Sequence, residues 1–409
     1  METIVKKGYV LRIGIDDFKD IRAYKGIEYS DMILHKTEEC IQAAITEKQK
    51  IYRISDDEFI VTGFNSPEED GKKLYDRICD QTMKFMEEKD YEVFLKISAG
   101  FVNLGDVEDH SHNNLMQITE FALSEAVKSG KNMFYVYTDE DYTAFSHKEE
   151  LLHIMQRAIH HDFEGFETYF QPIVKMEDGE LLSAETLLRF CSEETGQVSP
   201  AEFIPLLEES ELIIPVGRWV LYQAVKACSE IQKTIHDFQI SVNISYIQIL
   251  KSDLLKDLAK AMEIYSLPKG SMILELTESG FLEMNPDFTG FCNGLKELGI
   301  SFALDDFGTG YSNFHYLYSL SPNTIKIDRS FTVKALKGEW EYKLLHHMAE
   351  MTHSMNLKLC VEGIETKEEL ERINGIGPDY IQGFYFGRPS PFGTFLEEYV
   401  KYNIKVKAV

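Results

Sequence analysis

Polar side chains of the kinds that bind metal ions or handle phosphate groups follow short apolar runs between residues 183 and 383. Glu185, Glu275 and the adjacent pair Asp305 and Asp306 each end such a run. The other residues in equivalent positions are Asn243, Lys326, Glu362 and Gln382. Carboxylate and amide oxygens suit hard divalent cations, and cations beside a lysine suit a phosphate ester. The residue types therefore favour metal-assisted chemistry on a phosphate.

The elements that carry these residues are expected to be parallel strands. Short apolar runs separated by helical stretches are typical of such strands covered by helices. In a (β/α)8 barrel, the residues at the C-terminal ends of the strands point into one shared mouth. Taken singly, each polar residue could equally be a strand-end cap or a surface charge. Together, in one order along a barrel pattern, five carboxylates, two amides and a lysine predict a common site.

Bulk composition limits the classes of function. A chain of 409 residues exceeds what one core usually organises, so two domains are expected. The formal charge of −26 argues against binding to nucleic acid polymers or membrane surfaces, although a small anionic ligand stays possible. The six cysteines form no C-x-x-C pair, and no apolar stretch is long enough to cross a membrane. We therefore expect a cytoplasmic protein without a membrane segment.

The pattern of elements divides the chain into two domains. Residues 1–142 follow the order β-α-β-β-α-β-α-β, which predicts an α+β fold of the ferredoxin-like, nucleotidyl-cyclase-like kind. Residues 143–162 are expected to form a connecting helix. Residues 148–402 alternate helices and strands over the length that a TIM-like (β/α)8 barrel needs. The predicted fold class is thus α/β, with the barrel preceded by the α+β domain.

Four segments of the second domain resemble the EAL-domain cyclic di-GMP phosphodiesterases over residues 151–399. They are Glu185-Thr186-Leu187-Leu188-Arg189, the run from Asp305 to Ser312, Lys326-Ile327-Asp328, and Val361-Glu362-Gly363-Ile364-Glu365-Thr366. Two positions depart from the family pattern: Thr186 replaces Ala, and Asn313 stands where Ser is common. Neither is an expected ligand, so the resemblance still implies an active enzyme.

The resemblance implies a site with two Mg²⁺ or Mn²⁺ ions. The residues expected to bind the first ion are Glu185, Asn243, Glu275 and Asp305, and those expected to serve the second are Asp305, Asp306 and Glu362. Lys326 would orient or deprotonate the attacking water. The absence of a histidine among these ligands argues against a zinc hydrolase.

The resemblance also implies how the substrate is held. Gln171 and Gln382 would complete the site, and Arg189 would contact a substrate phosphate. Glu278 would stabilise the loop from Asp306 to Phe314, which couples the metals to a homodimer interface in this family. Asp328 and Glu365 are expected to lie behind the ligands. The implied reaction is metal-dependent hydrolysis of cyclic di-GMP to linear pGpG. The alternative is a receptor or scaffold that binds cyclic di-GMP without cutting it and signals through protein contacts.

The first domain resembles a degenerate GGDEF diguanylate cyclase domain, through the turn Ser55-Asp56-Asp57-Glu58-Phe59. An active cyclase needs two glycines in this turn so that backbone can approach a triphosphate. Here Ser55 and Asp56 add bulk and charge, although Asp57 is present.

Other cyclase positions of the first domain also differ from the family pattern. Gly14 replaces the strand-end Asp that would hold Mg²⁺, and Arg22 replaces the guanine-reading Asn, while Asp31 matches. Thr46 and Gln49 stand in place of the inhibitory R-x-x-D site. We predict no cyclic di-GMP synthesis. Either the domain binds GTP weakly, or it acts only as a dimerising and regulatory module.

Overall fold

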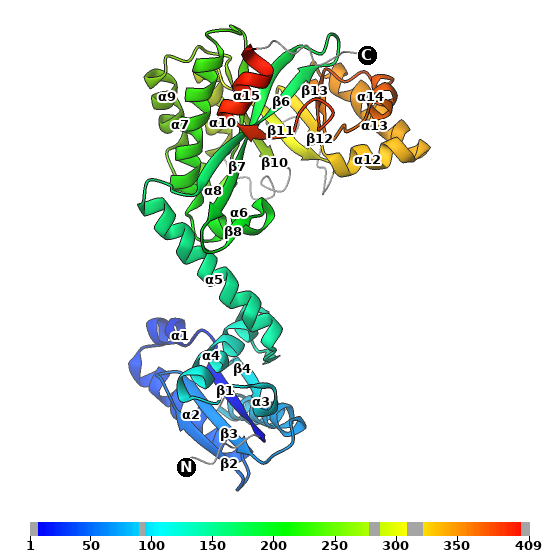
Figure 1. The fold of residues 1–409 in the computed structure, drawn as a ribbon. Helices are drawn as coiled ribbons and strands as arrows, with labels where there is room; N and C mark the ends of the chain where they lie inside the picture. The colour runs from blue at the N-terminus through cyan, green and yellow to red at the C-terminus, as the bar shows by residue number, and fades with distance from the viewer. Residues whose placement is uncertain (1–6, 90–94, 278–286, 309–321, 402–409) are drawn as a thin grey trace. The chain divides into compact units, whose positions relative to one another are not determined.

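The computed structural model describes residues 7–89, 95–277, 287–308 and 322–401. The chain divides into two compact units, residues 1–149 and 150–409 (Figure 1). Each unit is described by itself.

The first unit is built on a five-stranded sheet in the order β2-β3-β1-β4-β5. Its strands are β1 (Gly8–Ile15), β2 (Gln49–Arg53), β3 (Glu58–Phe64), β4 (Ile97–Asn103) and β5 (Phe134–Val136). β1 pairs with β3 and β4 in antiparallel fashion, while β4 and β5 run parallel. This is the predicted order of elements and the ferredoxin-like pairing.

Helices cover both faces of this sheet because its strands are apolar on both sides. The helices are α1 (Phe18–Lys25), α2 (Ile27–Ala44), α3 (Glu69–Lys89) and α4 (His112–Lys128). Tyr9 and Leu11 of β1 pack with side chains of α2 and α3, whereas Val102 of β4 packs with Phe121 of α4. Side chains of a strand alternate between faces, so neighbouring residues of β4 face different helices.

Helix α5 (Asp139–His160) spans the division between the two units. It begins four residues before the expected start of the connecting helix, residue 143, and ends two residues before the expected end, residue 162. Leu151, Ile154 and Met155 of its second half are buried in the core of the second unit.

The second unit is a closed barrel. Its eight barrel strands are β6 (Phe166–Lys175), β7 (Leu181–Ser192), β9 (Gln239–Asn243), β10 (Met272–Thr277), β11 (Ser301–Phe307), β12 (Thr324–Ile327), β13 (Lys358–Val361) and β14 (Tyr380–Gln382). They pair in this order, and β6 pairs with both β7 and β14, which closes the ring. The short strands β8 (Gly196–Val198) and β15 (Ser390–Pro391) extend β7 and β6.

One barrel strand differs from the expected all-parallel arrangement. β6 runs antiparallel to β7 and β14, whereas the strands from β7 through β9 to β14 run parallel. The connection between β6 and β7 covers only residues 176–180, and a parallel crossover needs about a dozen residues or more. The first two strands therefore form a hairpin, and Gln171 of β6 reaches the level of the other site residues from mid-strand.

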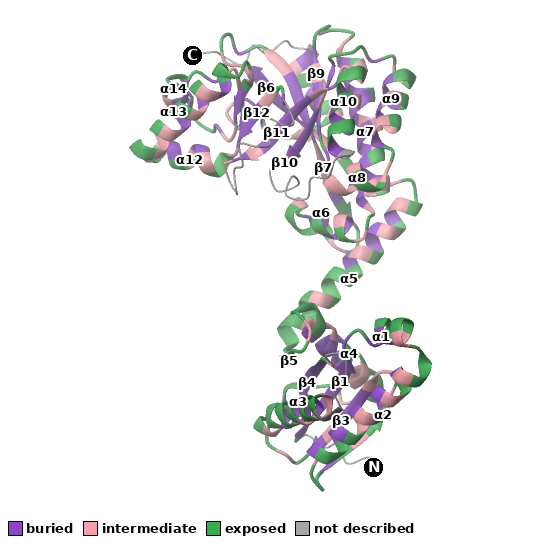
Figure 2. Ribbon diagram, turned by 180° about the vertical axis from the view of Figure 1, so that it is seen from behind, coloured by how far each residue is buried: buried purple, intermediate pink, exposed green. Residues whose placement is uncertain are grey.

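Helices surround the barrel and bury their inner faces. They are α6 (Pro200–Glu209), α7 (Ile213–Ile231), α8 (Tyr246–Lys251), α9 (Leu254–Ile264), α10 (Asp287–Leu298), α12 (Arg329–Lys337), α13 (Glu339–Ser354), α14 (Lys367–Asn374) and α15 (Phe392–Phe395). In Figure 1, α7, α9 and α10 lie on one side of the strands and α12, α13 and α14 on the other. Figure 2 shows buried residues on the strands and on the helix faces toward them.

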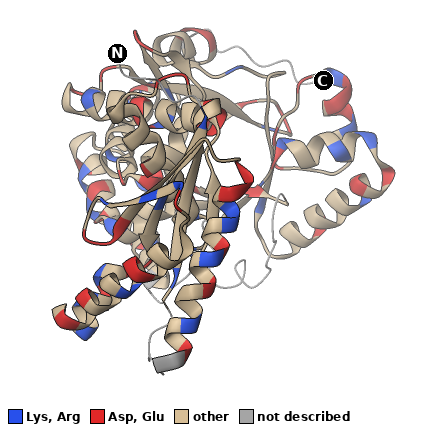
Figure 3. Cartoon of the chain, turned by 90° about the horizontal axis from the view of Figure 1, so that it is seen from below, with Lys and Arg blue, Asp and Glu red and all other residues tan. Residues whose placement is uncertain are grey.

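Charged residues lie mainly on the outer helices, with both signs interspersed (Figure 3). None of the described helices is long and apolar enough to cross a membrane.

A glycine beside Gln382 tests how tightly the barrel mouth is packed. A Cβ atom on Gly383 would lie 2.0 Å from the carbonyl oxygen of Ile364 and 2.4 Å from its nitrogen. Gly383→Ala should therefore lower the free energy of unfolding by about 1–3 kcal/mol, measured by thermal and denaturant melts. Gly290→Ala in α10 is the matched control, because its Cβ would meet open space. It should stabilise the helix by up to about 1 kcal/mol. Equal effects of the two substitutions would contradict the packing argument.

Candidate functional site

Strand register brings the polar residues of the sequence pattern to one end of the barrel. Glu185 of β7 lies opposite Gln171 of β6 and beside Ser241 of β9. Glu275 of β10 lies beside Asn243, the last residue of β9. These side chains come from segments up to about a hundred residues apart in the chain, and the closed ring makes them neighbours.

The ammonium group of Lys326 lies at the centre of the site. Its Nζ is 2.6 Å from Glu275 Oε2 and 2.7 Å from Glu362 Oε1. It is also 3.3 Å from Asp305 Oδ1 and 3.4 Å from Glu185 Oε2. The lysine side chain is only 2% exposed. One buried positive charge therefore holds four carboxylates from four strands or strand ends.

Three amide side chains complete this cluster. Asn243 Nδ2 donates to Glu185 Oε1 at 2.6 Å, and Gln382 Nε2 donates to Glu185 Oε2 at 2.6 Å. Gln382 Nε2 also lies 3.1 Å from Gln171 Oε1, and Gln171 Nε2 donates to the carbonyl of Gly387. The Oε1 atom of Gln382 is buried without a hydrogen-bond partner among the described residues. Glu185 is thus fixed from both sides, while one acceptor of the cluster is left for a ligand.

Burial and crowding shift the pKa values of these groups. Burial raises the pKa of Glu275 to about 8, and the neighbouring carboxylates add to this, against the effect of Lys326. Burial likewise raises the pKa of Asp305 and of Glu362 above the usual range. Burial alone would raise the pKa of Glu185 too, but Lys326, Gln382 and Asn243 together bring it below its ordinary value.

For the ammonium group of Lys326, nearby charges outweigh the effect of burial on the pKa. Burial would lower the pKa of Lys326, but the surrounding carboxylates outweigh it and raise that pKa well above the ordinary value. Lys326 is therefore a hydrogen-bond donor in this arrangement and keeps its proton at neutral pH.

The arrangement suits a hard divalent cation. Glu185, Glu275 and Asp305 each offer one oxygen, and these oxygens lie within 4.8 Å of one another. A single ammonium cannot compensate four ionised carboxylates, and burial with this shortfall accounts for the raised pKa values of Glu275, Asp305 and Glu362. A divalent cation would favour their ionised forms. An oxygen-only donor set of carboxylates and amides matches the ligands of Mg²⁺ or Mn²⁺.

Asp306, the other half of the Asp-Asp pair, has a left-handed backbone, with φ at 55°. Its N–H donates to Asp305 Oδ1 at 3.0 Å. Burial first, and then the charge of Asp305, raises the pKa of Asp306 to about 6. A left-handed conformation costs a non-glycine residue about 1–2 kcal/mol and clusters at functional sites. Because of this backbone conformation, the carboxylates of Asp305 and Asp306 do not follow the regular alternation of side chains along a strand.

A cavity of about 630 Å³ adjoins the carboxylate cluster, between β7, β9 and β10 and helices α6 to α8. Arg189 and Asn243 line it. The Arg189 guanidinium donates to the carbonyl of Leu188 and lies over the ring of Tyr169 at 5.5 Å. Among the described residues it has no carboxylate partner within ion-pair distance.

Sequence reasoning missed part of the wall of this cavity. Ser245 and Gln248 form a reciprocal capping box at the start of α8, and both line the cavity. Gln248 is buried, and a Cβ on Gly217 would lie 2.2 Å from its Nε2 atom. The spacing Ser-x-x-Gln, which begins two residues after Asn243, could have indicated this wall, because such a pair starts a helix at a strand end.

The two residues expected behind the ligands both contact the first turn of α12, and the charge of Asp328, after burial and Asp305, also helps to raise the pKa of Asp306. Asp328 caps α12 by accepting from the N–H of Ser330, and Glu365 forms an ion pair with Arg329. Glu278 and residues 309–321, with the substituted Asn313, lie outside the described residues.

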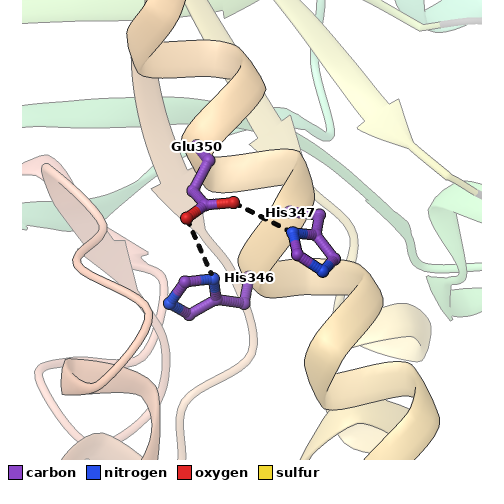
Figure 4. Close-up of side chains that lie close together, drawn as sticks. All are labelled: His346, His347 and Glu350. Carbon is purple, nitrogen blue, oxygen red and sulfur yellow. Dashed lines mark hydrogen bonds and ion pairs between the residues drawn. The ribbon is translucent and has the colours of Figure 1, made fainter.

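A second set of metal-capable side chains lies on the surface of α13. His346 and His347 both face Glu350, at 3.8 and 2.9 Å from its carboxylate oxygens (Figure 4). The set is partly or fully exposed, unlike the buried carboxylates, and no residue of the barrel site belongs to it. It provides a control for metal effects at the site.

Comparisons with known proteins agree with this geometry. The family model of the EAL domain matches residues 153–389, more than half of the chain, so the chain belongs to the EAL domain family. The model "Diguanylate cyclase, GGDEF domain" matches residues 2–133. The predicted family and fold class are confirmed.

The chain spans about half the length of the curated relatives it matches. It is 27% identical to the bifunctional diguanylate cyclase/cyclic di-GMP phosphodiesterase MucR of Pseudomonas aeruginosa, over 93% of this chain and 56% of that protein. It is 26% identical to the cyclic di-GMP phosphodiesterase PdeR of Escherichia coli, over 96% and 59%. A solved structure of the PaMucR phosphodiesterase in complex with c-di-GMP superposes with a TM-score of 0.57, at 31% identity. It covers 60% of this chain and all of that one.

Divalent cations should stabilise the native protein through the carboxylate cluster. Mn²⁺ or Mg²⁺ at about a hundred times its dissociation constant should add about 2.7 kcal/mol to the free energy of unfolding, seen as a higher Tm. Protons compete with the cation for Glu275, whose pKa is raised to about 8, so the shift should grow from pH 6 to pH 8.

Two variants test which side chains bind the cation that raises the Tm. Glu275→Gln should lose most of the cation-dependent Tm shift, whatever its Tm without metal, whereas His347→Ala should keep it. A shift that persists in Glu275→Gln and disappears in His347→Ala would assign the ion to the surface of α13.

Proposed function

We propose that the barrel hydrolyses cyclic di-GMP to linear pGpG and needs a divalent cation to do so. The observation that carries this proposal is the cluster of Glu185, Glu275, Asp305 and Glu362 around Lys326 at the mouth of the barrel. Membership of the EAL domain family supports it, as do relatives named cyclic di-GMP phosphodiesterases.

The residues that would hold two Mg²⁺ or Mn²⁺ ions are Glu185, Asn243, Glu275, Asp305, Asp306 and Glu362. Bound cations would neutralise the phosphodiester and make water a better nucleophile. Asn243 and Gln382 fix the carboxylate of Glu185 from two sides, so this ligand is oriented before any ion arrives.

Lys326 acts as a donor in the proposed reaction. Without bound cations, the surrounding carboxylates outweigh burial and raise its pKa, so the ammonium stays charged at neutral pH and can donate but not remove a proton. Instead it can orient a water or stabilise developing negative charge on a phosphate oxygen. Of the two roles expected for Lys326, the geometry favours orientation.

The adjoining cavity would bind the rest of the substrate. Its volume of about 630 Å³ is within the range of small-molecule sites, and its walls are largely apolar with a few polar groups. Arg189, half-buried and without a carboxylate partner among the described residues, is placed to meet a phosphate. Gln382 contacts both Glu185 and Gln171, and neither glutamine is among the residues that line this cavity.

Substitutions in the cluster test this function. Glu185→Gln and Lys326→Ala should each reduce the rate of pGpG formation by at least about 10²–10³-fold, since each removes a charged group from the reacting centre. The assay follows cyclic di-GMP and pGpG by chromatography with Mg²⁺ or Mn²⁺, and with a chelator added. Glu350→Gln on α13 is the control and should leave the rate unchanged. Full turnover in Glu185→Gln, or in the presence of the chelator, would contradict the proposal.

The same experiment separates the enzyme from its main alternative, a receptor that binds cyclic di-GMP without cutting it. A receptor would show saturable binding of cyclic di-GMP and no pGpG under any metal condition. The intact set of carboxylates favours the enzyme. A homodimer formed through the barrel is a further part of the proposal, and its molar mass in solution is the measurement that decides it.

We further propose that the first unit makes no cyclic di-GMP. Arg22 and Asp56, both departures from the cyclase pattern, face each other, with Nη1 3.3 Å from Oδ2. The pair is exposed and adds little stability, but it puts side chains where a cyclase would bring glycine backbone to a triphosphate. Gly14 stands in place of the Asp that would hold Mg²⁺ in a cyclase, and a Cβ atom there would lie 3.1 Å from Leu123 of α4.

The purified protein given GTP and Mg²⁺ should therefore produce no cyclic di-GMP within the detection limit of the assay. A separate GTP titration by calorimetry distinguishes the two roles left for this unit. Measurable heat, reduced in Asp57→Ala, would support weak GTP binding, and its absence would leave a regulatory or dimerising module. Synthesis of cyclic di-GMP would overturn the proposal.

A further inference from the structure

The layer of the barrel directly beneath the carboxylate cluster contains few bulky aliphatic side chains. Side chains alternate along a strand, so residues two positions before Glu185, Glu275, Asp305, Lys326, Glu362 and Gln382 also face the barrel interior. These residues are Ser183, Ile273, Ala303, Thr324, Cys360 and Tyr380. Barrels of this class usually fill such layers with bulky branched side chains. Here only one of the six is a branched aliphatic residue.

A cavity of about 260 Å³ occupies this layer, and all six residues line it. Lys326 and Glu275, each 2% exposed, form its inner end. Asn323, Asn356 and Lys358, which lie at the N-terminal ends of the strands, form its outer rim and are exposed. The cavity therefore opens on the end of the barrel opposite the substrate mouth and reaches the ammonium from the other side.

We propose that this cavity is a water-filled passage from the N-terminal end of the barrel to Lys326. Its volume holds several water molecules at about 30 Å³ each, and its polar lining offers them partners. A dry cavity would leave the underside of a buried ion cluster without solvation, which is costly. Hydrolysis consumes one water molecule for each phosphodiester bond that breaks, and a substrate in the mouth would cover the other entrance. That supply role rests on the proposed hydrolysis, whereas the passage itself does not.

A native cysteine allows a direct test. Cys360 lines the cavity and is 2% exposed. Cys228 is equally buried, with its Sγ near the carbonyl oxygens of Phe238 and Ser271, and is not among the residues lining this cavity. Burial raises the pKa of both thiols, that of Cys228 to about 12. The two thiols therefore differ mainly in whether a passage leads to them.

The full chain is treated with methyl methanethiosulfonate, a small neutral reagent, and labelling of each cysteine is timed by peptide mass spectrometry. Cys360 should react at least about tenfold faster than Cys228, because a passage gives entry without unfolding. Equal rates for the two thiols would overturn the passage.

Substitutions at the rim identify the entrance. Ser301→Phe places a large side chain in the cavity wall near the rim and should slow labelling of Cys360 toward the rate of Cys228. Ser354→Phe, an exposed position at the end of α13 that does not line the cavity, should leave the rate unchanged. If Ser301→Phe lowers the Tm, Thr324→Met on the neighbouring strand replaces it as the test variant. Unchanged labelling in both rim variants would mean that the reagent enters by the substrate mouth, which also overturns the proposal.

Turnover measured on the same samples keeps the two proposals apart. Labelling does not require hydrolysis, so an inactive protein with fast, rim-dependent labelling of Cys360 keeps the passage and loses the phosphodiesterase. An active protein whose Cys360 is protected from labelling keeps the phosphodiesterase and loses the passage. If both hold, Ser301→Phe should lower kcat with little change in KM, since water supply and not substrate binding is affected.

Discussion

The burial of one ammonium group among four carboxylates is the constraint on which the barrel site depends. Neither sign of charge could be removed from water alone, because an unpaired buried ion costs several kcal/mol. Lys326 pairs with carboxylates from β7, β10, β11 and the end of β13, so it links strands on different sides of the ring. Four carboxyl groups outnumber the one ammonium, and burial together with this crowding raises the pKa values of Glu275, Asp305 and Glu362. The packing of the ring and the pKa values of the site thus share one electrostatic origin.

The geometry of the closed ring follows from this constraint and from the hairpin that begins it. β6 runs against its neighbours because its connection to β7 is too short for a crossover. Gln171 then stands opposite Glu185 and contacts Gln382, which closes the cluster at the seam between the first and last strands. Period-two alternation along the same strands sets the layer below. The residues of the carboxylate cluster and those that line the inner cavity are therefore determined together, two positions apart.

The first unit keeps the architecture of its family model although the turn between β2 and β3 contains no glycine. The sheet order, the alternation of β1 and the packing of α4 need only apolar residues at regular spacing, and these are present. The turn between β2 and β3 needs glycine only if a ligand approaches its backbone. Ser55 and Asp56 are compatible with the hairpin, so the fold tolerates changes that a triphosphate site would not.

The sequence by itself determined the class of each unit and the strand-end residues that the barrel brings together. Apolar runs of strand length ending on Glu185, Glu275, Asp305 and Glu362 could be recognised because parallel strands present their C-terminal ends together. The antiparallel first strand of the ring, the strained backbone of Asp306, the pairing of four carboxylates with one ammonium and the cavity beneath it were decided by tertiary structure alone. Lys326 looked like a rim lysine in isolation, and only its position among four carboxylates gives it a buried charge. Local patterns report which way a side chain points along its own strand. Distances between strands, and hence charge balance and empty volume, arise only when the ring closes.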